Sequence, residues 1–365
     1  MSKKTAQQDD KPPSFQGPWK VAVLANIKDE HQERPANVPS DAFADFDHIE
    51  TIQHIQAALE TDGHETIFIE ANADLAYALK DLQPDICFNI AEGLGGDARE
   101  AQTPALLESM GIPYTGSRVL TNTIALDKTL TKRIWRDRNL PVAPFQEFSA
   151  PDEHLRQSLH FPLFVKPARE GTGMGVDMHA KVETEAELRK RVAYITENYK
   201  QPALVESFLP GREFTVGQIG RSGAKLKSRH PEWYSARGFH QFPILELESS
   251  SSATPGIYSN EAKSHSLGEA GAPQYLCPAD VDEELARKMK RLALRAHNLL
   301  GALDVSRVDV RLDAEGNPRL IEINPLPGLT PGYSDLCIQA AADGIAYEEL
   351  ILEILYLGAS RWGLY

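Results

Sequence analysis

Short apolar runs alternate with segments of helical periodicity in the first part of the chain. The predicted elements are, in order, a strand at Lys20–Ile27, a helix at Asp45–Leu59, a strand at Glu65–Glu70, a helix at Asp74–Leu82 and a strand at Asp85–Ile90. Such alternation is typical of a parallel sheet covered by helices. Ligands of open parallel sheets bind beyond the carboxyl ends of the strands, so the polar loops after Ile27 and Ile90 are candidate binding loops.

The pattern changes near residue 120. A small α+β unit is predicted by a helix at Asp127–Asn139, a strand at Phe161–Ala168, a helix at Thr184–Tyr199 and a strand at Pro202–Phe208. The remaining predicted elements are strands at Glu213–Gly220 and Phe242–Glu248, a helix at Val281–Leu300, a hairpin at 307–328 and closing helices from Asp335.

These patterns divide the chain into an N-terminal α/β domain at 19–119, a small subdomain at 120–206 and a C-terminal subdomain at 207–365. Residues 1–18 are charged and proline-rich, and we expect a disordered tail there, not a secretion signal or a membrane span. Residues 249–274 exceed the usual length of a loop, and Lys263 in their middle favours a lid over a disordered segment.

Composition and net charge indicate which classes of partner the protein binds. The chain has 365 residues, 42% of them apolar, and a formal net charge of −14, which predicts a soluble globular protein with a sizeable core. The acidic balance argues against binding to nucleic acid or to an anionic membrane, and favours small molecules. Its three cysteines lie far apart without the spacing of metal ligands, which is typical of reduced structural thiols in the cytoplasm.

The predicted hairpin RVDVRLDAEGNPRLIEINPLPG carries polar side chains where a half-buried sheet normally carries apolar ones. If Asp313 pairs with Pro318 around the turn AEGN, Asp309 falls opposite Glu322 and Arg307 falls opposite Asn324. Alternation then gives the hairpin one apolar face, made of Val308, Val310, Leu312, Ile321 and Ile323. Its other face carries Arg307, Asp309, Glu322 and Asn324.

Two carboxylates that face each other across a ladder repel each other unless a cation lies between them. Oxygen ligands with a carboxamide beside them suit Mg²⁺, which keeps some waters and reaches substrate phosphates. The alternative is that Arg307 and Arg311 neutralise these carboxylates on a solvated face of the sheet.

Other signals are individually weak. The segment GTGMG at 171–175 follows the strand that carries Lys166, and its backbone N–H groups could close over phosphates, although a plain turn explains it equally well. It lacks the Gly-Lys-Ser/Thr of a Walker A loop. Lys128 and Lys132 have the spacing of ordinary helix-surface lysines, and Glu206 and Glu213 flank the turn LPG as exposed glutamates often do.

The order of these signals is specific, and from about Lys20 to Leu355 the chain resembles the D-alanine–D-alanine ligases of the ATP-grasp superfamily. The resemblance is carried by EGLGGDAREAQTPALLESMGIPYTGS, ALDKTLTK, FVKPAREGTGMGV, LVESFLPGREFTV, EAK, CPA and RVDVRLDAEGNPRLIEINPLPGLTP. It implies an ATP-grasp fold of mixed α/β and α+β class, preceded by a parallel-sheet (pre-ATP-grasp) domain that binds substrate.

The resemblance also implies residue roles. Lys128 and Lys166 would hold the nucleotide phosphates beneath the loop of Thr172 and Gly173, Glu206 would lie at the adenine, and Glu213 would accept the ribose hydroxyls. Two Mg²⁺ ions, or Mn²⁺ in their place, would be bound by Asp309, Glu322 and Asn324. These implied roles make ATP and a divalent cation the expected cofactors.

The implied reaction transfers the γ-phosphoryl group of ATP to a carboxylate and then lets an amine attack the acyl phosphate. Positioning and charge neutralisation are sufficient for such a phosphoryl transfer, so no protein nucleophile is required. In the family's pattern the donors to the oxyanion are Arg307 and the Gly328 N–H. Lys263 would reach the transferred phosphate when the lid closes. A homodimer formed through the N-terminal region is also implied.

The sequence departs from the family's pattern around the amino-acid substrate. Glu92 stands where family members carry a histidine, and Arg99 lies nearby. The glutamate that usually pairs with the first ammonium has no clean match, although Ala44 or Asp45 falls near it. Where family members usually carry a tyrosine in the lid, this chain has Ser264. Thr172 likewise replaces a serine that is usual in the family. Tyr333 aligns with the serine that receives the second carboxylate, with Ser334 adjacent.

We therefore expect an ATP-dependent carboxylate–amine ligase with a divergent pair of amino-acid or amine substrates. Either Arg99 pairs with Glu92 and the pocket remains suited to D-alanine, or Glu92 binds a cationic group. An ordinary D-alanine–D-alanine ligase of cell-wall synthesis is the alternative. A non-catalytic ATP-binding regulator would be expected to lose a metal ligand or a phosphate lysine, and a carboxylase or thiol ligase would need biotin or coenzyme A contacts.

Overall fold

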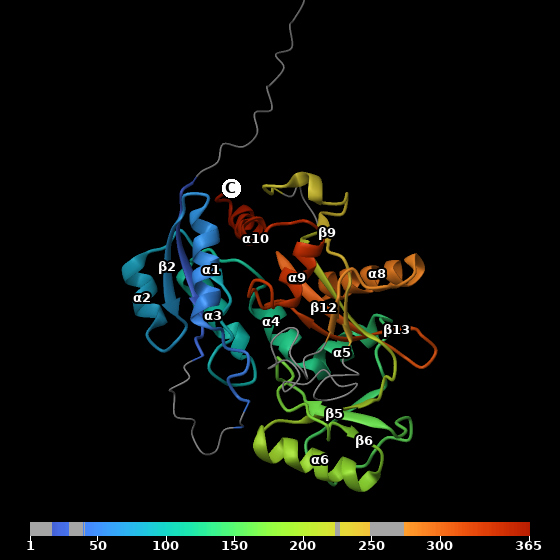
Figure 1. Ribbon diagram of the computed structural model, residues 1–365. Coiled ribbons are helices and arrows are strands. Elements are labelled where there is room, and N and C mark those ends of the chain that lie inside the picture. Colours follow the sequence, from blue (N-terminus) through green and yellow to red (C-terminus); the bar gives the residue numbers. More distant parts are fainter. Residues whose placement is uncertain (1–16, 29–38, 40, 223–226, 249–273) are drawn as a thin grey trace, which may run out of the picture.

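The structure is a computed structural model that describes residues 17–28, 39, 41–222, 227–248 and 274–365. Nearly all of the predicted tail and lid, including Lys263 and Ser264, therefore lies outside the described residues. The described chain forms three sheets with helices packed on them (Figure 1). None of the helices in these ranges is long and apolar enough to span a bilayer. The three cysteines are free thiols, as predicted.

The first sheet is parallel, as the alternation of strands and helices predicts. Its order is β2–β1–β3, with β1 at Lys20–Ala25, β2 at Glu65–Glu70 and β3 at Ile86–Asn89. Each face packs against helices in a separate hydrophobic core. One core includes α1 (Ile49–Glu60) and the C-terminal α10 (Tyr347–Trp362), and the other includes α2 (Leu75–Leu82) and α3 (Gln102–Met110).

Helix α1 begins four residues later than the periodicity predicts, at Ile49 instead of Asp45. The predicted start is wrong because tertiary pairing overrides the local pattern. Asp47 forms an isolated parallel bridge with Ile27, and its carbonyl accepts a hydrogen bond of 2.8 Å from the Lys28 N–H. Asp47 thereby lies beside the residues that follow β1, with Asp45 in the turn before it, and the side chains of Asp45 and Asp47 line a cavity instead of covering a helix.

The second sheet has four antiparallel strands and is covered by α6 (Glu185–Asn198). Its order is β4–β7–β5–β6, with β4 at Phe145–Phe148, β7 at Ala203–Ser207, β5 at Leu163–Pro167 and β6 at Lys181–Val182. Apolar residues of the strands pack on Leu188, Val192 and Ile195 of the helix. This sheet and α6 lie apart from the first sheet at the lower end of the molecule in Figure 1.

The third sheet lies between the other two and carries the hairpin. Its order is β11–β10–β8–β12–β13, with β9 added beside β8. The strands are β8 (Glu213–Gly220), β9 (Phe239–Gln241), β10 (Leu245–Glu248), β11 (Gln274–Leu276), β12 (Val305–Leu312) and β13 (Pro318–Asn324). Short 3₁₀ segments occur at Arg99–Ala101 and Pro231–Trp233.

One face of the third sheet packs on α8 (Glu283–Leu300), together with the ends of α4 (Val119–Leu126) and α5 (Lys128–Asp137). Trp135 of α5 is fully buried in this core. Helix α9 (Asp335–Ala342) then leads the chain back to α10 and the first sheet. Although α4 and α5 fall within the predicted small subdomain, they pack on the large sheet, and the boundaries at 119 and 206 stay predictions.

The predicted register of the hairpin is confirmed for the pairs on the polar face. It is wrong by one residue nearer the turn. Arg307 pairs with Asn324 and Asp309 pairs with Glu322, as predicted. Between Asp309 and Val310 the register shifts, so that Leu312, and not Asp313, pairs with Pro318. A β-bulge of this kind leaves one residue without a cross-strand partner. Leu320 consequently replaces Ile321 in the core, and Ile321 turns into a cavity on the polar side.

Candidate active site

Two cavities meet at the polar face of the hairpin. The first lies between the second and third sheets, and the second lies between the end of the first sheet and the loop that follows β13. Asp309 and Glu322, a cross-strand pair, line the first cavity, whereas the neighbouring pair Arg307 and Asn324 lines the second. The alternating side chains of one β-hairpin therefore serve both cavities.

Most residues expected to bind nucleotide line the first cavity: Lys128, Lys166, Gly173, Glu206 and Glu213. Thr172 lines the second cavity instead. The segment of Thr172 and Gly173 forms a tight turn with φ of 50° and 72°, and Gly175 follows at 68°. A Cβ at Gly175 would lie 2.4 Å from the Pro167 side chain, so only glycine allows this turn to pack on the end of β5.

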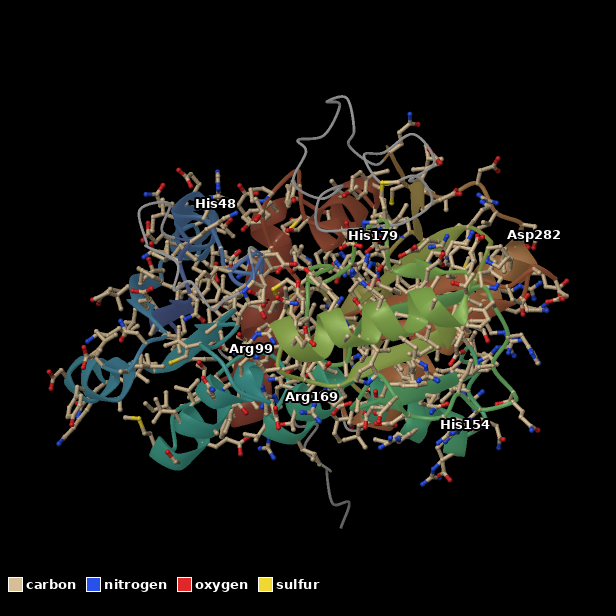
Figure 2. All side chains as sticks on the ribbon, turned by 90° about the horizontal axis from the view of Figure 1, so that it is seen from below. His48, Arg99, His154, Arg169, His179 and Asp282 are labelled. Atoms are coloured by element: carbon tan, nitrogen blue, oxygen red, sulfur yellow. The ribbon has the colours of Figure 1, made fainter. Side chains whose placement is uncertain are left out.

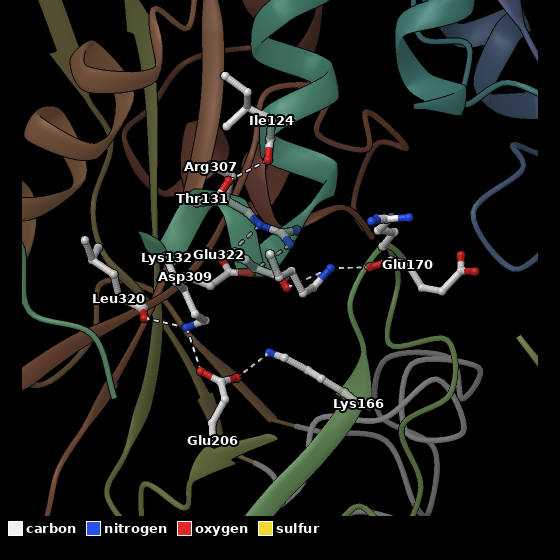
Figure 3. A network of polar contacts seen from close by, with 12 residues as sticks. Ile124, Thr131, Lys132, Lys166, Glu170, Glu206, Arg307, Asp309, Leu320 and Glu322 are labelled. Carbon is white, nitrogen blue, oxygen red and sulfur yellow. Dashed lines mark hydrogen bonds and ion pairs between the residues drawn. The ribbon is translucent and has the colours of Figure 1, made fainter. Parts of the chain in front are cut away.

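Glu206 is the centre of a buried charge network in the first cavity (Figure 3). Its carboxylate lies 2.8 Å from Lys132 Nζ and 3.2 Å from Lys166 Nζ, and the Lys132 ammonium also donates to the Leu320 carbonyl at 3.1 Å. Burial opposes the charge of Glu206, but the two ammonium groups outweigh it and lower the pKa of that carboxyl. Burial lowers the pKa of Lys132, whose side chain is 0% exposed.

Lys128 begins α5 at the edge of the same network. Asp127 caps the helix by accepting a hydrogen bond of 2.8 Å from the Leu130 N–H, and its other carboxylate oxygen accepts one from Arg169 Nε at 2.9 Å. The Lys128 ammonium contacts the Glu170 carbonyl and lies 3.4 Å from Glu322 Oε2. Lys128 and Lys166 therefore face the hairpin from two different elements.

The first cavity also brings Glu213 and Arg311 together. These residues are cross-strand neighbours on β8 and β12, and Arg311 Nη1 lies 2.8 Å from Glu213 Oε2. Ile321, Phe164, Met174 and Val176 supply apolar walls. A cavity with apolar walls, buried lysines and a carboxylate at its rim suits a nucleotide, whose base is flat and whose phosphates are anionic.

The proposed metal ligands lie in adjacent positions of the hairpin. The Asp309 carboxylate accepts hydrogen bonds from Thr215 Oγ1 at 2.6 Å and from Arg307 Nε at 3.1 Å, and Glu322 lies against Lys128. No group of three His, Cys, Asp or Glu side chains placed to hold a metal occurs within the described ranges. The donor set expected from the sequence is two carboxylates and the Asn324 amide, which are oxygen ligands of the kind that suits Mg²⁺. Cations contact both carboxylates, as expected where two like charges face each other.

The second cavity contains all but one of the remaining predicted site residues in the described chain. Asp45, Glu92, Arg307, Gly328, Tyr333 and Ser334 line it. A Cβ on Gly328 would lie 2.9 Å from Ser334 Oγ, and this hydroxyl accepts a hydrogen bond of 2.9 Å from the Thr330 N–H. Gly328 thus keeps its backbone close to Ser334 at the cavity wall.

Arg99 lies behind this cavity, not on its surface, and its partners decide between the two arrangements expected for Glu92. The guanidinium lies 2.6 Å from Asp45 Oδ2 and 3.4 Å from Glu170 Oε2, and donates to the Arg169 carbonyl at 3.1 Å. Figure 2 shows Arg99 and Arg169 side by side. No ion pair joins Arg99 to Glu92 in the described part of the chain. Arg99 therefore acts on Glu92 through its charge, which opposes the rise in the Glu92 pKa, but not through a direct ion pair.

Carboxylates dominate the second cavity. Burial, with the carboxylates of Glu100 and Asp45, raises the pKa of Glu92 well above its ordinary value. Burial raises the pKa of Glu100 to about 7 although Arg99 opposes the shift, and burial together with Asp45 raises the pKa of Asp47 to about 7. These groups lose their charge readily unless a cation approaches them.

Sequence reasoning missed several residues that line the two cavities or support their walls. Thr215 supports Asp309, and its signal was the alternation of polar residues with Phe214 and Val216 along β8. Lys132 has the spacing of an ordinary helix-surface lysine, but its spacing of four residues from Lys128 places both on one face of α5. Asp47 and Glu100 carried no local signal, because only the tertiary fold brings them beside Glu92.

If the first cavity binds ATP, as the resemblance implies, Lys132→Met is expected to weaken that binding without slowing the chemical step. Glu206 would keep Lys166 as a partner but lose a buried cation, at a cost to stability of about 1–3 kcal/mol. The KM for ATP should rise about tenfold while kcat changes little, because Lys132 positions Glu206 and touches no reacting atom.

Chemical unfolding and steady-state kinetics measure both effects. Arg133→Met is the matched control, since Arg133 lies on the same helix with its side chain 51% exposed. An unchanged KM for ATP in Lys132→Met, or a fall in kcat alone, would contradict the positioning role.

Comparison with known proteins identifies the family of the chain. A family model described as the D-ala D-ala ligase C-terminus matches residues 134–356. An uncharacterized protein named y4sG from Sinorhizobium fredii is 31% identical over 84% of this chain and 87% of its own length. A D-alanine–D-alanine ligase from Methylococcus capsulatus is 32% identical over 82% of this chain and 86% of its own.

A solved structure gives the same picture for the fold. The crystal structure of a D-alanine–D-alanine ligase from Bacillus anthracis, complexed with ATP, superposes with a TM-score of 0.70 at 22% sequence identity. The match covers 95% of this chain and 99% of that chain. The whole described architecture, from the first sheet to α10, is therefore shared with that fold.

Proposed function

The chain belongs to the D-alanine–D-alanine ligase family, and we propose that it is an ATP-dependent ligase that joins the carboxylate of one amino acid to the amine of a second substrate. The ATP-grasp fold predicted from the sequence, with its N-terminal parallel sheet, is confirmed. The reaction forms an amide bond and yields ADP and phosphate.

One observation carries this proposal: the two cavities meet at a single hairpin. A nucleotide in the first cavity would place its terminal phosphate beside Asp309 and Glu322, one residue pair away from Arg307 and Asn324 in the second cavity. A carboxylate bound in the second cavity would then lie next to the phosphate that it receives. Proximity of this kind supplies a large part of the acceleration of phosphoryl transfer.

Residues of the first cavity would bind ATP. Lys128 and Lys166 would contact the phosphates, the backbone of Gly173 would close over them, and Glu213 would accept hydrogen bonds from the ribose. Glu206 would lie at the adenine, held in its charged form by Lys132 and Lys166. In the structure, the ammonium groups of Lys128 and Lys166 already lie among carboxylates, so ATP would exchange one set of anionic partners for another.

Asp309, Glu322 and Asn324 fit Mg²⁺ by their chemistry and by their adjacent positions. Mg²⁺ bound there would neutralise charge on the phosphates. Thr215 would hold the Asp309 carboxylate in place through its hydroxyl. Arg307, which lines the second cavity and pairs with Asp309 and Asp335 in the structure, would keep Asp335 as its partner.

In the second cavity the γ-phosphoryl group would move to the first substrate's carboxylate oxygen while ADP leaves. The amine of the second substrate would attack the acyl carbon, lose a proton and expel phosphate. Arg307 and the Gly328 N–H would donate hydrogen bonds to the oxyanion. Tyr333 and Ser334 would bind the second substrate's carboxylate. Asp45 and Glu92 would face the first substrate. Arg99 would hold Asp45 in place through its hydrogen bond. Lys263 lies outside the described residues, and its contact with the transferred phosphate stays a prediction.

The substrates need not be two D-alanines. Relatives are named D-alanine–D-alanine ligases, but Glu92 lies in a cavity where Arg99 pairs directly with Asp45 and not with Glu92. We therefore favour a divergent pair of amino acids or amines, with an ordinary D-alanine–D-alanine ligase as the alternative. We also propose the domain division at 119 and 206, a homodimer formed through the N-terminal domain, and a cytoplasmic location.

Trapping with hydroxylamine tests the reaction class. The full chain, with ATP, Mg²⁺ and a panel of amino acids, should release ADP and convert the activated carboxylate to a hydroxamate, because hydroxylamine attacks acyl phosphates. Omission of the amino acid is the control. ATP binding without ADP release or hydroxamate for every amino acid would identify a non-catalytic nucleotide-binding protein instead.

A further inference from the structure

We propose that the first substrate carries a second cationic group in addition to its α-ammonium, which makes it a basic or diamino acid. This inference rests on the ligase function proposed above and specifies the substrate that the second cavity accepts. It follows from the partners of the charged groups around that cavity.

Carboxylates outnumber cations on the cavity wall. Five acidic side chains of the described chain line it, namely Asp45, Asp47, Glu92, Glu100 and Asp335, against the single guanidinium of Arg307. Arg307 lies 2.8 Å from Asp335 and 3.1 Å from Asp309, so its charge is already shared by two carboxylates. The remaining four acidic groups face the cavity from the loops that follow β1 and β3 and from the 3₁₀ segment Arg99–Ala101.

Asp45 indicates where an ammonium group would bind. Its side chain is 2% exposed, and its Oδ2 receives the Arg99 guanidinium at 2.6 Å. Its Oδ1 has no hydrogen-bond donor in the described chain. A buried carboxylate oxygen without a donor is costly, and an N–H donor from a ligand in the cavity would satisfy it. We assign the α-ammonium group of the first substrate to this oxygen of Asp45.

Three acidic groups remain without an ion pair to a described cation: Asp47, Glu92 and Glu100. The Arg99 guanidinium is held by Asp45, Glu170 and the Arg169 carbonyl. Burial and neighbouring carboxylates raise the pKa of each of the three carboxyls, and for Glu92 and Glu100 they outweigh the opposing charge of Arg99. A zwitterion such as alanine brings only one ammonium group. A second cationic group on the substrate side chain would neutralise charge on these three carboxylates.

Matched pairs of amino acids test the inference. Each pair has a similar size and differs in the side-chain charge: lysine against norleucine, and 2,3-diaminopropionate against alanine, each in D and L forms. The full chain is assayed by hydroxamate formation, which reports the first substrate alone. We expect the basic member to exceed its neutral partner at least tenfold in kcat/KM, because charge-assisted hydrogen bonds in buried sites are strong.

The outcomes separate this inference from the proposed function. If hydroxamate forms from neutral amino acids as fast as from basic ones, or faster, the inference is wrong while the ligase function stands. If no amino acid yields hydroxamate or ADP, the proposed function fails first.

Substitutions then locate the second cation. Glu92→Gln and Glu100→Gln should each lower the preference for the basic member at least tenfold. Asp97→Asn is the matched control, since Asp97 lies in the same loop with its side chain 83% exposed and pairs with Arg169 at 3.0 Å. Preferences within twofold of wild type in both glutamine variants would overturn the assignment. If one variant fails to fold, the other and the matched pairs still decide.

Discussion

Glu322→Gln is expected to abolish amide formation, with a fall in kcat of about a thousandfold or more. A neutral amide cannot neutralise the charge of Mg²⁺, and its nitrogen is a poor ligand for that ion. Metal ions supply several kcal/mol of charge stabilisation in phosphoryl transfer, and each 1.4 kcal/mol corresponds to about a factor of ten in rate. Lys128 would also lose the carboxylate that lies 3.4 Å from its ammonium group. ADP release at saturating ATP measures the effect.

Titration with Mg²⁺ separates loss of the metal from damage to the fold. Glu315→Gln is the matched control, because Glu315 lies exposed in the turn of the same hairpin, outside both cavities. It should leave kcat and the Mg²⁺ dependence unchanged. If Glu322→Gln retained activity within about tenfold of wild type at saturating Mg²⁺, Glu322 would not be a metal ligand, and the alternative of a solvated, arginine-neutralised face would be favoured.

The hairpin shows how far the sequence predicts this site. The alternation of polar and apolar residues correctly pairs Asp309 with Glu322, because side-chain period and register are local properties of two strands joined by a short turn. The sequence does not predict the bulge, because Leu320 and Ile321 are both apolar and either could pack in the core. Packing against α8 and the first cavity decides that choice.

The substrate cavity was predicted less well, and for a physical reason. Its charged groups come from segments far apart in the sequence, and the Arg99 partner Asp45 lies 54 residues away. A single sequence can show that Glu92 and Arg99 are close along the chain, but it does not show with which carboxylate Arg99 forms an ion pair. The loop of Asp45 and Asp47 was also assigned to a helix, although a bridge to Ile27 holds it along the end of β1.

Arg307→Ala is expected to lower kcat by about a hundredfold or more while ATP binds almost normally. The reason is that a donor aimed at charge that develops only in the intermediate contributes to the chemical step and not to ground-state binding. The structure gives Arg307 a second possible role, because its guanidinium lies against Asp309 and Asp335. A neutraliser of these carboxylates would act on metal and nucleotide affinity, so KM for ATP and kcat must be measured together.

Two further variants distinguish these roles. Arg319→Ala removes an arginine that pairs with Asp313 at 2.8 Å on the same hairpin, away from both cavities, and should change neither parameter. Arg307→Lys restores the charge but not the paired donors of a guanidinium. If Arg307 stabilises the oxyanion, lysine should leave kcat low while the affinity for ATP stays normal. If Arg307 only neutralises Asp309 and Asp335, the alanine variant should lose affinity for ATP with a high residual rate at saturation, and lysine should restore that affinity.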